Sequence, residues 1–475
     1  AWTLFEAQVE ASKLPSILVA NTLNWNRSGM VEVFIENSIL PEGIDFVMKD
    51  KEGRAIEVRE YERRQEGAYY GLWVEEVPAN GYKTILIYTG EHNSSTPYKT
   101  SSVFENEFYT LKIDPSKGLV TSLFDKDLQK ELIDQKDTLS LGQVIYEQLD
   151  NRHELERLTA SNRDTIYKPL DLKRTLLSHI KLVKQENGPI YQSIFLNGAL
   201  PICTDHRGVD IEIRLYHHEK KVAFHYRMFK LPVVNPEGVY VSFPFYLEEG
   251  QLFYEARGGL VSPGVNQLEG TSSDWNALQN FAAVKNQEEQ IVFTSKDMPL
   301  VQFGDLNIGR YYYRLDPKTN HIYSWVLNNY WVTNFKAEQQ GELRWSYSIG
   351  SSRNSTNTWS TRFGWSDRVP LQARVLWPSV NTEKSKAHSK SFFDLMAPNL
   401  LLVNSSPSMD GQGLILHIRE VEGAHHTHLD IHALLSQTGA TSASKVNVLE
   451  DEISVLQGET HMHPFETLFI KLSFD

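Results

Sequence analysis

The stretch from Gly208 to Leu231, GVDIEIRLYHHEKKVAFHYRMFKL, gives the clearest indication of the fold of the central part of this chain. Apolar residues alternate with polar ones on both sides of a polar turn, first Val209, Ile211, Ile213 and Leu215, then Val222, Phe224, Tyr226 and Met228. A period of two residues on both sides of a turn predicts a long antiparallel hairpin with one buried face.

Similar strand patterns recur along the whole chain, and helical periodicity is scarce. They are found in MVEVFIEN, YKTILIYTG, NEFYTLKID, VYVSFPFYL and TLFIKLSF. A helical turn or two is predicted only within DWNALQNFAAV (274–284), and a charged surface helix within DNRHELERLTASNRD (150–164). The fold class is therefore predicted to be all-β, with a large two-sheet sandwich at its centre.

Chain length and two polar, turn-rich stretches indicate the domain organisation. A chain of 475 residues is too long for a single ordinary core. Segments 89–102 and 379–391 have the composition of linkers. We predict three domains: a small β-sandwich over 1–92, a large β-sandwich over 98–378 and a C-terminal β-sandwich over 390–475.

Charge and hydropathy exclude several classes of partner. The chain has 47 basic and 60 acidic residues, a formal net charge of −13, and no run of Lys or Arg. This balance argues against nucleic acid and anionic membranes as partners. No apolar run approaches the ~18 residues that a membrane-spanning helix needs, so no membrane insertion is expected. Neutral polar ligands, sugars included, remain open.

The chain has one cysteine, Cys203, which excludes an internal disulfide and a cysteine-based zinc site. We predict a buried free thiol at this position. The sequence begins at Ala1 without Met or a signal sequence, so we expect a trimmed product. The compartment stays open between the bacterial cytoplasm, the periplasm and the exterior.

Histidines and carboxylates are numerous, but no spacing among them defines a site. The histidines near the C-terminus include a His-x-Asp triplet, His428-Leu429-Asp430, and are His417, His425, His426, His428, His432, His461 and His463. Zinc catalysis needs three or four ligands with an open position, so we expect exposed strand and turn histidines instead. The acidic stretch FDKDLQKELID (124–134) is expected to form strand ends and solvated turns. No catalytic residue and no metal ligand is therefore assigned.

Three segments combine aromatic rings with amides or carboxylates near a strand end: LGQVIYEQLDNR (141–152), QLEGTSSDWNALQNF (267–281) and SWVLNNYWVTNF (324–335). Aromatic anchors with a few placed polar groups are typical of a concave sugar site, although a packed aromatic core has the same composition. The candidate sugar-contacting residues are Tyr146, Asp274, Trp275, Asn329 and Trp331.

Five segments, in order, resemble the C-terminal β-region of glycoside hydrolase family 38, the retaining α-mannosidases, and its bacterial branch in particular. Together they span nearly the whole chain. They are SILVANTLNWNRSGMVEVFI (16–35), FENEFYTLKIDPSKGLVTSLFDKDLQKELI (104–133), EIRLYHHEKKVAFHYRMFKLPVVNPEGVYVSFPF (212–245), NNYWVTNF (328–335), and VNVLEDE (446–452) with HPFETLFIKL (463–472).

The resemblance implies a large supersandwich similar to galactose mutarotase, flanked by two smaller β-sandwich domains. In the family, the zinc ligands and the aspartate nucleophile lie on an N-terminal α/β barrel, which a helical bundle follows. We expect this chain to begin after both, with no cofactor of its own and zinc in the missing catalytic domain. His428-Leu429-Asp430 is not the family's zinc motif. The parent protein is expected to cleave α-mannosides, and this chain alone is expected to be inactive.

The same resemblance implies that the β-region completes the sugar cleft, with Tyr146 as the nearest match to a sugar-binding tyrosine. Asn328, Asn329 and Trp331 are expected to order a loop near the side that faces the barrel, part of it core and part of it rim. The partners are then a mannose-containing oligosaccharide and the N-terminal catalytic barrel of the same protein. Two alternatives remain. One is a free-standing carbohydrate-binding protein. The other is a mutarotase- or lyase-like enzyme, which needs a His/Glu pair, or Tyr with Arg and Asn, converging on one sugar carbon.

Overall fold

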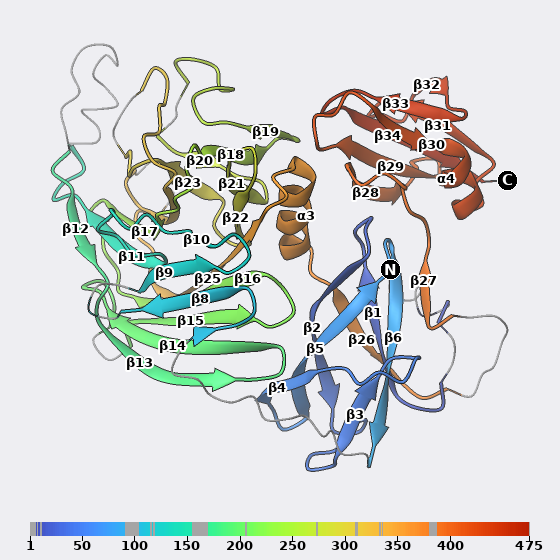
Figure 1. The fold of residues 1–475 in the computed structure, drawn as a ribbon, viewed down its shortest axis with the longest axis horizontal. Helices are drawn as coiled ribbons and strands as arrows, with labels where there is room; N and C mark the ends of the chain where they lie inside the picture. Colours follow the sequence, from blue (N-terminus) through green and yellow to red (C-terminus); the bar gives the residue numbers. More distant parts are fainter. Residues whose placement is uncertain are drawn as a thin grey trace. The chain divides into compact units, whose positions relative to one another are not determined.

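The computed structural model describes residues 6, 8–9, 12–90, 104–114, 116, 119–153, 170–204, 207–271, 274–308, 312–331, 334, 336–379 and 387–474. The fold of these residues is dominated by antiparallel sheets, so the all-β prediction is confirmed (Figure 1). The helices whose full extent is described are α3 (Asn357–Arg368) and α4 (Ile431–Thr438). Most of both predicted linkers, and of the helix predicted over 150–164, lies outside the described residues.

The chain forms two compact units. One contains 1–98, 188–190 and 369–475, and the other contains 99–187 and 191–368. The boundary predicted at residue 378 falls after a strand, β26 (Gln372–Leu376), that pairs with β1 (Ser16–Asn21) of the first unit. The three-domain division itself stays a prediction. Among the described residues, no helix combines the length and apolar character that a membrane crossing requires.

The second unit is a large sandwich built mainly from a six-stranded and a nine-stranded sheet. The six-stranded sheet has the order β12 (Lys173–Leu176), β11 (Gln143–Gln148), β17 (Glu237–Phe243), β24 (Ile322–Asn328), β23 (Leu300–Phe303), β20 (Asn276–Ala277). The nine-stranded sheet has the order β13 (Ser178–Asn187), β14 (Tyr191–Ala199), β15 (Val209–Tyr216), β16 (Lys221–Lys230), β25 (Gly341–Ser352), β22 (Gln290–Ser295), β21 (Phe281–Lys285), β18 (Gln251–Ala256), β19 (Gly259–Val261).

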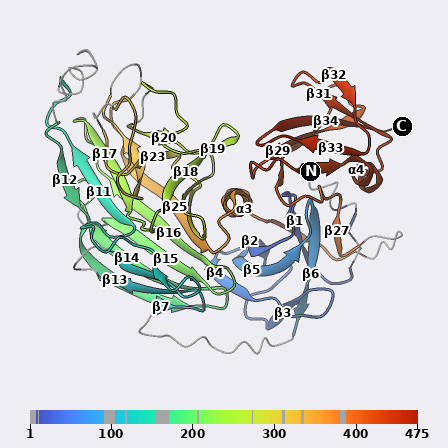
Figure 2. The same ribbon diagram turned by 45° about the horizontal axis from the view of Figure 1, so that its top comes forward.

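The hairpin predicted from residues 208–231 is confirmed as β15 and β16, which lie side by side with β14 in Figure 2. Ile213 pairs with Phe224, and both side chains are fully buried. The apolar face of this hairpin packs into one core together with Val144, Val239 and Phe243 of the six-stranded sheet. The period-two pattern therefore marks the face that the two sheets share.

A four-stranded sheet contributes to the same core and has the order β10 (Lys130–Glu131), β9 (Val120–Asp125), β8 (Tyr109–Ile113), β7 (Phe104–Glu105). Asp125, at the end of β9, is fully buried rather than solvated as predicted. Its Oδ1 accepts the N–H groups of Asp127 at 2.8 Å and Leu128 at 2.9 Å. Buried carboxylates need such partners, and these two hold the turn that follows the strand.

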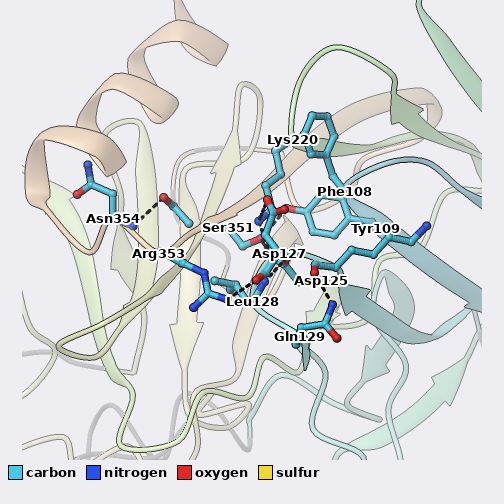
Figure 3. A network of polar contacts seen from close by, with 12 residues as sticks. Phe108, Tyr109, Asp125, Asp127, Leu128, Gln129, Lys220, Ser351, Arg353 and Asn354 are labelled. Atoms are coloured by element: carbon cyan, nitrogen blue, oxygen red, sulfur yellow. Dashed lines mark hydrogen bonds and ion pairs between the residues drawn. The ribbon is translucent and has the colours of Figure 1, made fainter.

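Figure 3 shows how the other oxygen of Asp125 is satisfied. Lys220 Nζ lies 2.9 Å from Oδ2, and the Ser351 hydroxyl donates to it at 2.5 Å. Because Ser351 has one proton, the Tyr109 hydroxyl donates to Ser351 Oγ, at 2.6 Å. The network ties the four-stranded sheet to β25 and to the β15–β16 turn. Its role is structural, because both carboxylate oxygens of Asp125 are already engaged by hydrogen bonds or an ion pair.

The first unit contains two smaller sandwiches. In the N-terminal one, a five-stranded sheet faces a three-stranded sheet across the core that contains Ile17, Val33, Leu72 and Ile85. The five-stranded sheet consists of β26, β1, β6 (Gly81–Thr89) and β27 (Ser389–Ser391), with β3 (Phe46–Lys49) on β6, and the three-stranded sheet of β2 (Arg27–Glu36), β5 (Gly67–Val77) and β4 (Val58–Arg63).

The C-terminal sandwich is joined to this part by Asn24, whose side chain is bonded to the backbone of Leu400 and Leu402 at 2.8 Å each. It has a five-stranded sheet, β28 (Leu400–Pro407), β29 (Gly413–Glu420), β34 (Thr467–Ser473), β31 (Ser442–Val446) and β32 (Glu452–Val455), and a ribbon of β30 (Thr427–Asp430) and β33 (Glu459–Met462). Asp430 caps α4 by accepting the Ala433 N–H at 2.9 Å, and Gly439 ends the helix with φ of 74°.

Two helix assignments differ from the sequence prediction. DWNALQNFAAV is not helical, because it contributes β20 and β21 to two different sheets. Helix α3, in contrast, was missed. Its start carries a recognisable signal, since the Thr356 hydroxyl accepts the Trp359 N–H at 3.2 Å as a capping residue does. The helix covers the outer face of β21 and β22, so tertiary packing supports a segment whose apolar periodicity is weak.

Candidate functional site

The five candidate residues lie on or beside the six-stranded sheet. Tyr146 is in β11, and Asn329 and Trp331 directly follow β24. Trp275 directly precedes β20, and Asp274 is half-buried beside it. The five residues thus come from three strands that are distant in sequence but belong to one sheet.

Tyr146 and Asn329 lie on the inner side of this sheet, around a buried ion pair. Lys230 Nζ is 2.6 Å from Glu237 Oε1, and both side chains are fully buried. The Asn329 amide donates to the same oxygen at 3.0 Å, and its backbone N–H donates to the Glu237 carbonyl at 2.9 Å. Burial, and then the charge of Glu237, raise the pKa of the Tyr146 phenol. Both candidates are therefore buried against Glu237.

A second buried carboxylate, Glu147, lies on the outer side of the same sheet. Its Oε1 accepts the Tyr330 hydroxyl and, at 3.4 Å, the Tyr240 hydroxyl. Arg174 on the neighbouring strand donates from Nε to Oε2 at 2.6 Å. Burial and the charge of Glu147 raise the pKa of both tyrosines, which stay protonated donors.

The ring of Tyr330 reaches Glu147 because Gly238 has no side chain. A Cβ at position 238 would lie 2.5 Å from the Tyr330 hydroxyl and 2.8 Å from its ring. Arg152 donates to the Tyr330 carbonyl at 2.6 Å. Segment 328–331 is thus held through side chains and backbone, which explains its mixture of amides and rings: the amide of Asn329 and the ring of Tyr330 anchor the segment.

Three tryptophan rings, one of them from this segment, pack against one another beside Tyr330. The ring centroids of Trp275 and Trp331 are 5.4 Å apart, and Trp325 lies 5.4 Å from Trp275 and 6.3 Å from Trp331. Trp325 is 2% exposed, whereas Trp275 and Trp331 are half-buried. We call Trp275 and Trp331 the aromatic rim. Their remaining ring surface can stack against the C–H face of a sugar, with Asp274 as the adjacent polar group.

Sequence reasoning missed Glu147, Glu237 and Lys230. Glu147 and Glu237 each supply the one charge of a strand, and Lys230 continues the apolar phase of β16, so a charge at a position expected to be buried was the available signal. Their partners lie far along the chain, so the sequence does not indicate which charges meet. The roles of the five candidate residues as sugar contacts stay predictions.

The His/Glu pair that the mutarotase-like alternative requires exists on the outer face of the nine-stranded sheet. His225 and Glu212 are direct cross-strand neighbours, in a groove of about 570 Å³. Both oxygens of Glu212 are bound by Arg214, at 2.8 and 2.9 Å. Burial, and then Arg214, Lys296 and Lys221, lower the pKa of His225 well below its usual value. The carboxylate is therefore engaged and the imidazole is neutral.

The remaining candidate groups have structural roles or lie exposed. Asp430 of the His-x-Asp triplet caps α4. His428 and His461 face each other across β30 and β33 and are exposed, while His417 is half-buried and stacked on Phe469. Cys203 is a buried free thiol, as predicted, and burial raises its pKa to about 11. In the part of the chain that the structure describes, no three His, Cys, Asp or Glu side chains are grouped as metal ligands.

Comparison with known proteins extends these observations. The family model described as "Glycosyl hydrolases family 38 C-terminal domain" matches residues 104–295. No curated protein matches the sequence. Among solved structures, an alpha-mannosidase from Enterococcus faecalis V583 has 14% identity and a TM-score of 0.72, covering 100% of this chain and 58% of that one.

A protein in glycosyl hydrolase family 38 from Enterococcus faecalis also has 14% identity, with a TM-score of 0.68, over 100% of this chain and 60% of that one. A galactose mutarotase related enzyme from Lactobacillus acidophilus has 9% identity and a TM-score of 0.30, over 53% of this chain and 97% of that one. The chain thus spans about three fifths of the length of the two Enterococcus proteins and has their fold. The sequence match over residues 104–295 and the two structural matches support a C-terminal region of glycosyl hydrolase family 38.

Proposed function

We propose that this chain is the non-catalytic C-terminal β-region of an α-mannosidase, and that it completes and supports the sugar cleft of an N-terminal catalytic barrel of the same protein. The observation that carries this proposal is the aromatic rim, two half-buried tryptophan rings of which Trp331 directly follows two residues that buried carboxylates hold. The ligand is a mannose-containing oligosaccharide, whose apolar face stacks on Trp275 and Trp331.

In this proposal the barrel supplies zinc and the nucleophile, and the β-region supplies one wall of the cleft. Trp275, Trp331 and Asp274 contact the sugar. Tyr146 and Asn329, which are buried around Glu237, support the wall from beneath. The match of the whole chain to two longer proteins supports an arrangement in which a further part carries the chemistry.

The test compares this chain with the full-length protein on an aryl α-mannoside. We expect hydrolysis by the full-length protein and none by the chain alone. Trp331→Ala in the full-length protein should lower kcat/KM about tenfold, since a lost aromatic anchor is worth roughly 1–2 kcal/mol. The matched control is Trp359→Ala, because Trp359 is also half-buried and stacked on a ring, that of Phe363 on α3.

Chelator-sensitive hydrolysis by the chain alone would overturn the non-catalytic role, and a full-length protein without α-mannosidase activity would overturn the proposal as a whole. Tyr146→Phe separates the two kinds of residue. We expect it to change kcat/KM less than Trp331→Ala, because the phenol is directed at Glu237. If the chain alone binds methyl α-mannoside as tightly as the full-length protein does, the carbohydrate-binding module is the better description.

A further inference from the structure

The two buried glutamates of the six-stranded sheet hold consecutive residues of one segment from opposite faces. Glu237 binds Asn329 on the inner side, and Glu147 binds Tyr330 on the outer side. The next residue, Trp331, belongs to the aromatic rim, and its ring centroid lies 5.9 Å from that of Tyr330. Fixing two successive residues on two faces leaves the backbone little freedom where the rim begins.

Packing alone does not explain these charges. A fully buried ion pair such as Lys230–Glu237 loses the hydration of both ions, and replacing it by apolar residues of similar volume is often neutral or stabilising. Glu147 is likewise fully buried, although its partner Arg174 keeps a side chain that is 35% exposed. A sheet selected only for stability has no need of either carboxylate, whereas a segment that must present a ring in one orientation needs fixed acceptors.

We propose that Glu147 and Glu237 are positioning residues that act through Tyr330 and Asn329 to set the orientation of Trp331 toward the sugar, with Lys230 compensating the charge of Glu237. The inference rests on the proposed function only in taking Trp331 as a sugar contact. Neither glutamate reaches the ligand, since neither side chain is exposed.

The first experiment reads the orientation of Trp331 in this chain, without any sugar. The chain is labelled with 5-fluorotryptophan, and Trp331→Phe assigns the ¹⁹F resonance. Two charge-matched variants isolate the hydrogen bond of Glu237. Lys230→Met/Glu237→Gln keeps an acceptor for Asn329, and Lys230→Met/Glu237→Leu removes it. We expect the Trp331 resonance to stay in place in the Gln variant and to move in the Leu variant.

Glu147 gives the second matched pair. Glu147→Gln keeps an acceptor for the Tyr330 hydroxyl, and Glu147→Leu removes it, so only the Leu variant should move the resonance. The control is Ser242→Ala in β17, which removes a buried hydrogen bond to the Ser140 carbonyl at 2.6 Å without touching segment 328–331. We expect this control to lower stability and to leave the resonance unchanged. An unmoved resonance in both Leu variants overturns the inference, and so does a control that moves it as far.

The second experiment measures kcat and KM for the hydrolysis of an aryl α-mannoside by the full-length protein. Each Leu variant should raise KM about three- to tenfold with kcat nearly unchanged, as expected when a binding contact rather than the reacting group is displaced. Combining both Leu replacements should raise KM by more than the product of the single effects, because each glutamate alone still holds one of the two residues.

The two experiments separate the inference from the proposed function. A resonance that moves while KM does not supports the positioning role and overturns the sugar contact at Trp331. KM values that rise only in proportion to lost stability, equally in the Gln and Leu variants, overturn the positioning role.

Discussion

The two large sheets of the central sandwich share one core, but their outer faces differ in how completely they are buried. Strand β17 of the six-stranded sheet is buried at all seven positions, whereas β15 of the nine-stranded sheet alternates between buried and half-buried residues. An aromatic layer that includes Tyr240, Trp325 and Tyr330 covers the outer face of the six-stranded sheet. On the nine-stranded sheet, α3 covers β21 and β22, and beyond it lies the polar groove around His225.

This contrast shows in which strands the residue pattern carries information about function. A strand with one solvated face alternates, and its polar residues need no partner within the protein. A strand covered on both faces reads as continuously apolar, so a charge within it must be paired. Glu147 and Glu237 are such charges, and both lead to segment 328–331. On the outer face of the nine-stranded sheet, Arg344 forms an ion pair with Glu342 while its own side chain is 68% exposed.

The largest expected effect compares outward-facing side chains on the two sheets. Trp325→Ala should lower the free energy of unfolding by about 3–5 kcal/mol, because it removes a large side chain from a packed layer and leaves a cavity. Arg344→Ala should change it by no more than about 0.5 kcal/mol, because Arg344 is 68% exposed and forms a surface ion pair with Glu342. Urea denaturation followed by tryptophan fluorescence measures both. Equal losses would mean that the outer faces do not differ in the way described.

The next prediction concerns the ion pair that joins the sheets, since Lys230 ends β16 and Glu237 begins β17. Lys230→Met alone should cost about 3–5 kcal/mol, because it leaves a buried carboxylate without its counter-charge. Lys230→Met/Glu237→Leu should recover most of that loss. Urea denaturation of the single and double variants measures both free energies of unfolding. A double variant as unstable as the single one would show that the charge is not the cause.

Glycines test how closely each outer face is covered. A Cβ at Gly238 would meet Tyr330 at 2.5 Å, and one at Gly350 would meet Phe363 of α3 at 2.4 Å. Gly238→Ala and Gly350→Ala should each cost about 1–3 kcal/mol through overpacking. Gly259→Ala is the control, because its nearest neighbour lies at 4.0 Å, and it should change stability by less than about 1 kcal/mol in either direction. Thermal unfolding ranks the three variants.

The smallest expected effect is the acid sensitivity of the nine-stranded sheet. Because the folded-state pKa of His225 is lowered, the unfolded chain takes up a proton below pH ~6.5 that the folded chain does not. Stability contributed by the neutral imidazole is therefore complete above that pH and falls as the pH drops, by up to about 1.4 kcal/mol per unit. His225→Gln should flatten the loss between pH 7 and 5. An unchanged slope, measured by urea denaturation at both values, would contradict this assignment.

Short-range sequence patterns were sufficient to predict much of the local architecture of this protein. The period-two pattern of 208–231 identified β15 and β16, and the order of five segments indicated the family, because both depend on residues close in sequence. The free thiol of Cys203 was predicted because the sequence contains a single cysteine. Local patterns failed only where tertiary contacts outweighed them, as in the strands β20 and β21, which were taken for helix.

The pairing of the buried polar groups, in contrast, depends on contacts between residues that are distant in sequence. Asn329 binds a glutamate 92 residues away and Tyr330 one that is 183 residues away, and no periodicity encodes such a pairing. For the same reason the sequence did not indicate that Tyr146 lies beside Glu237, and its role as a sugar contact stays a prediction. Burial makes an unpaired charge costly, so the fold must bring the partners together. Which partners they are depends on strand order in the sheet, a property of the whole sandwich.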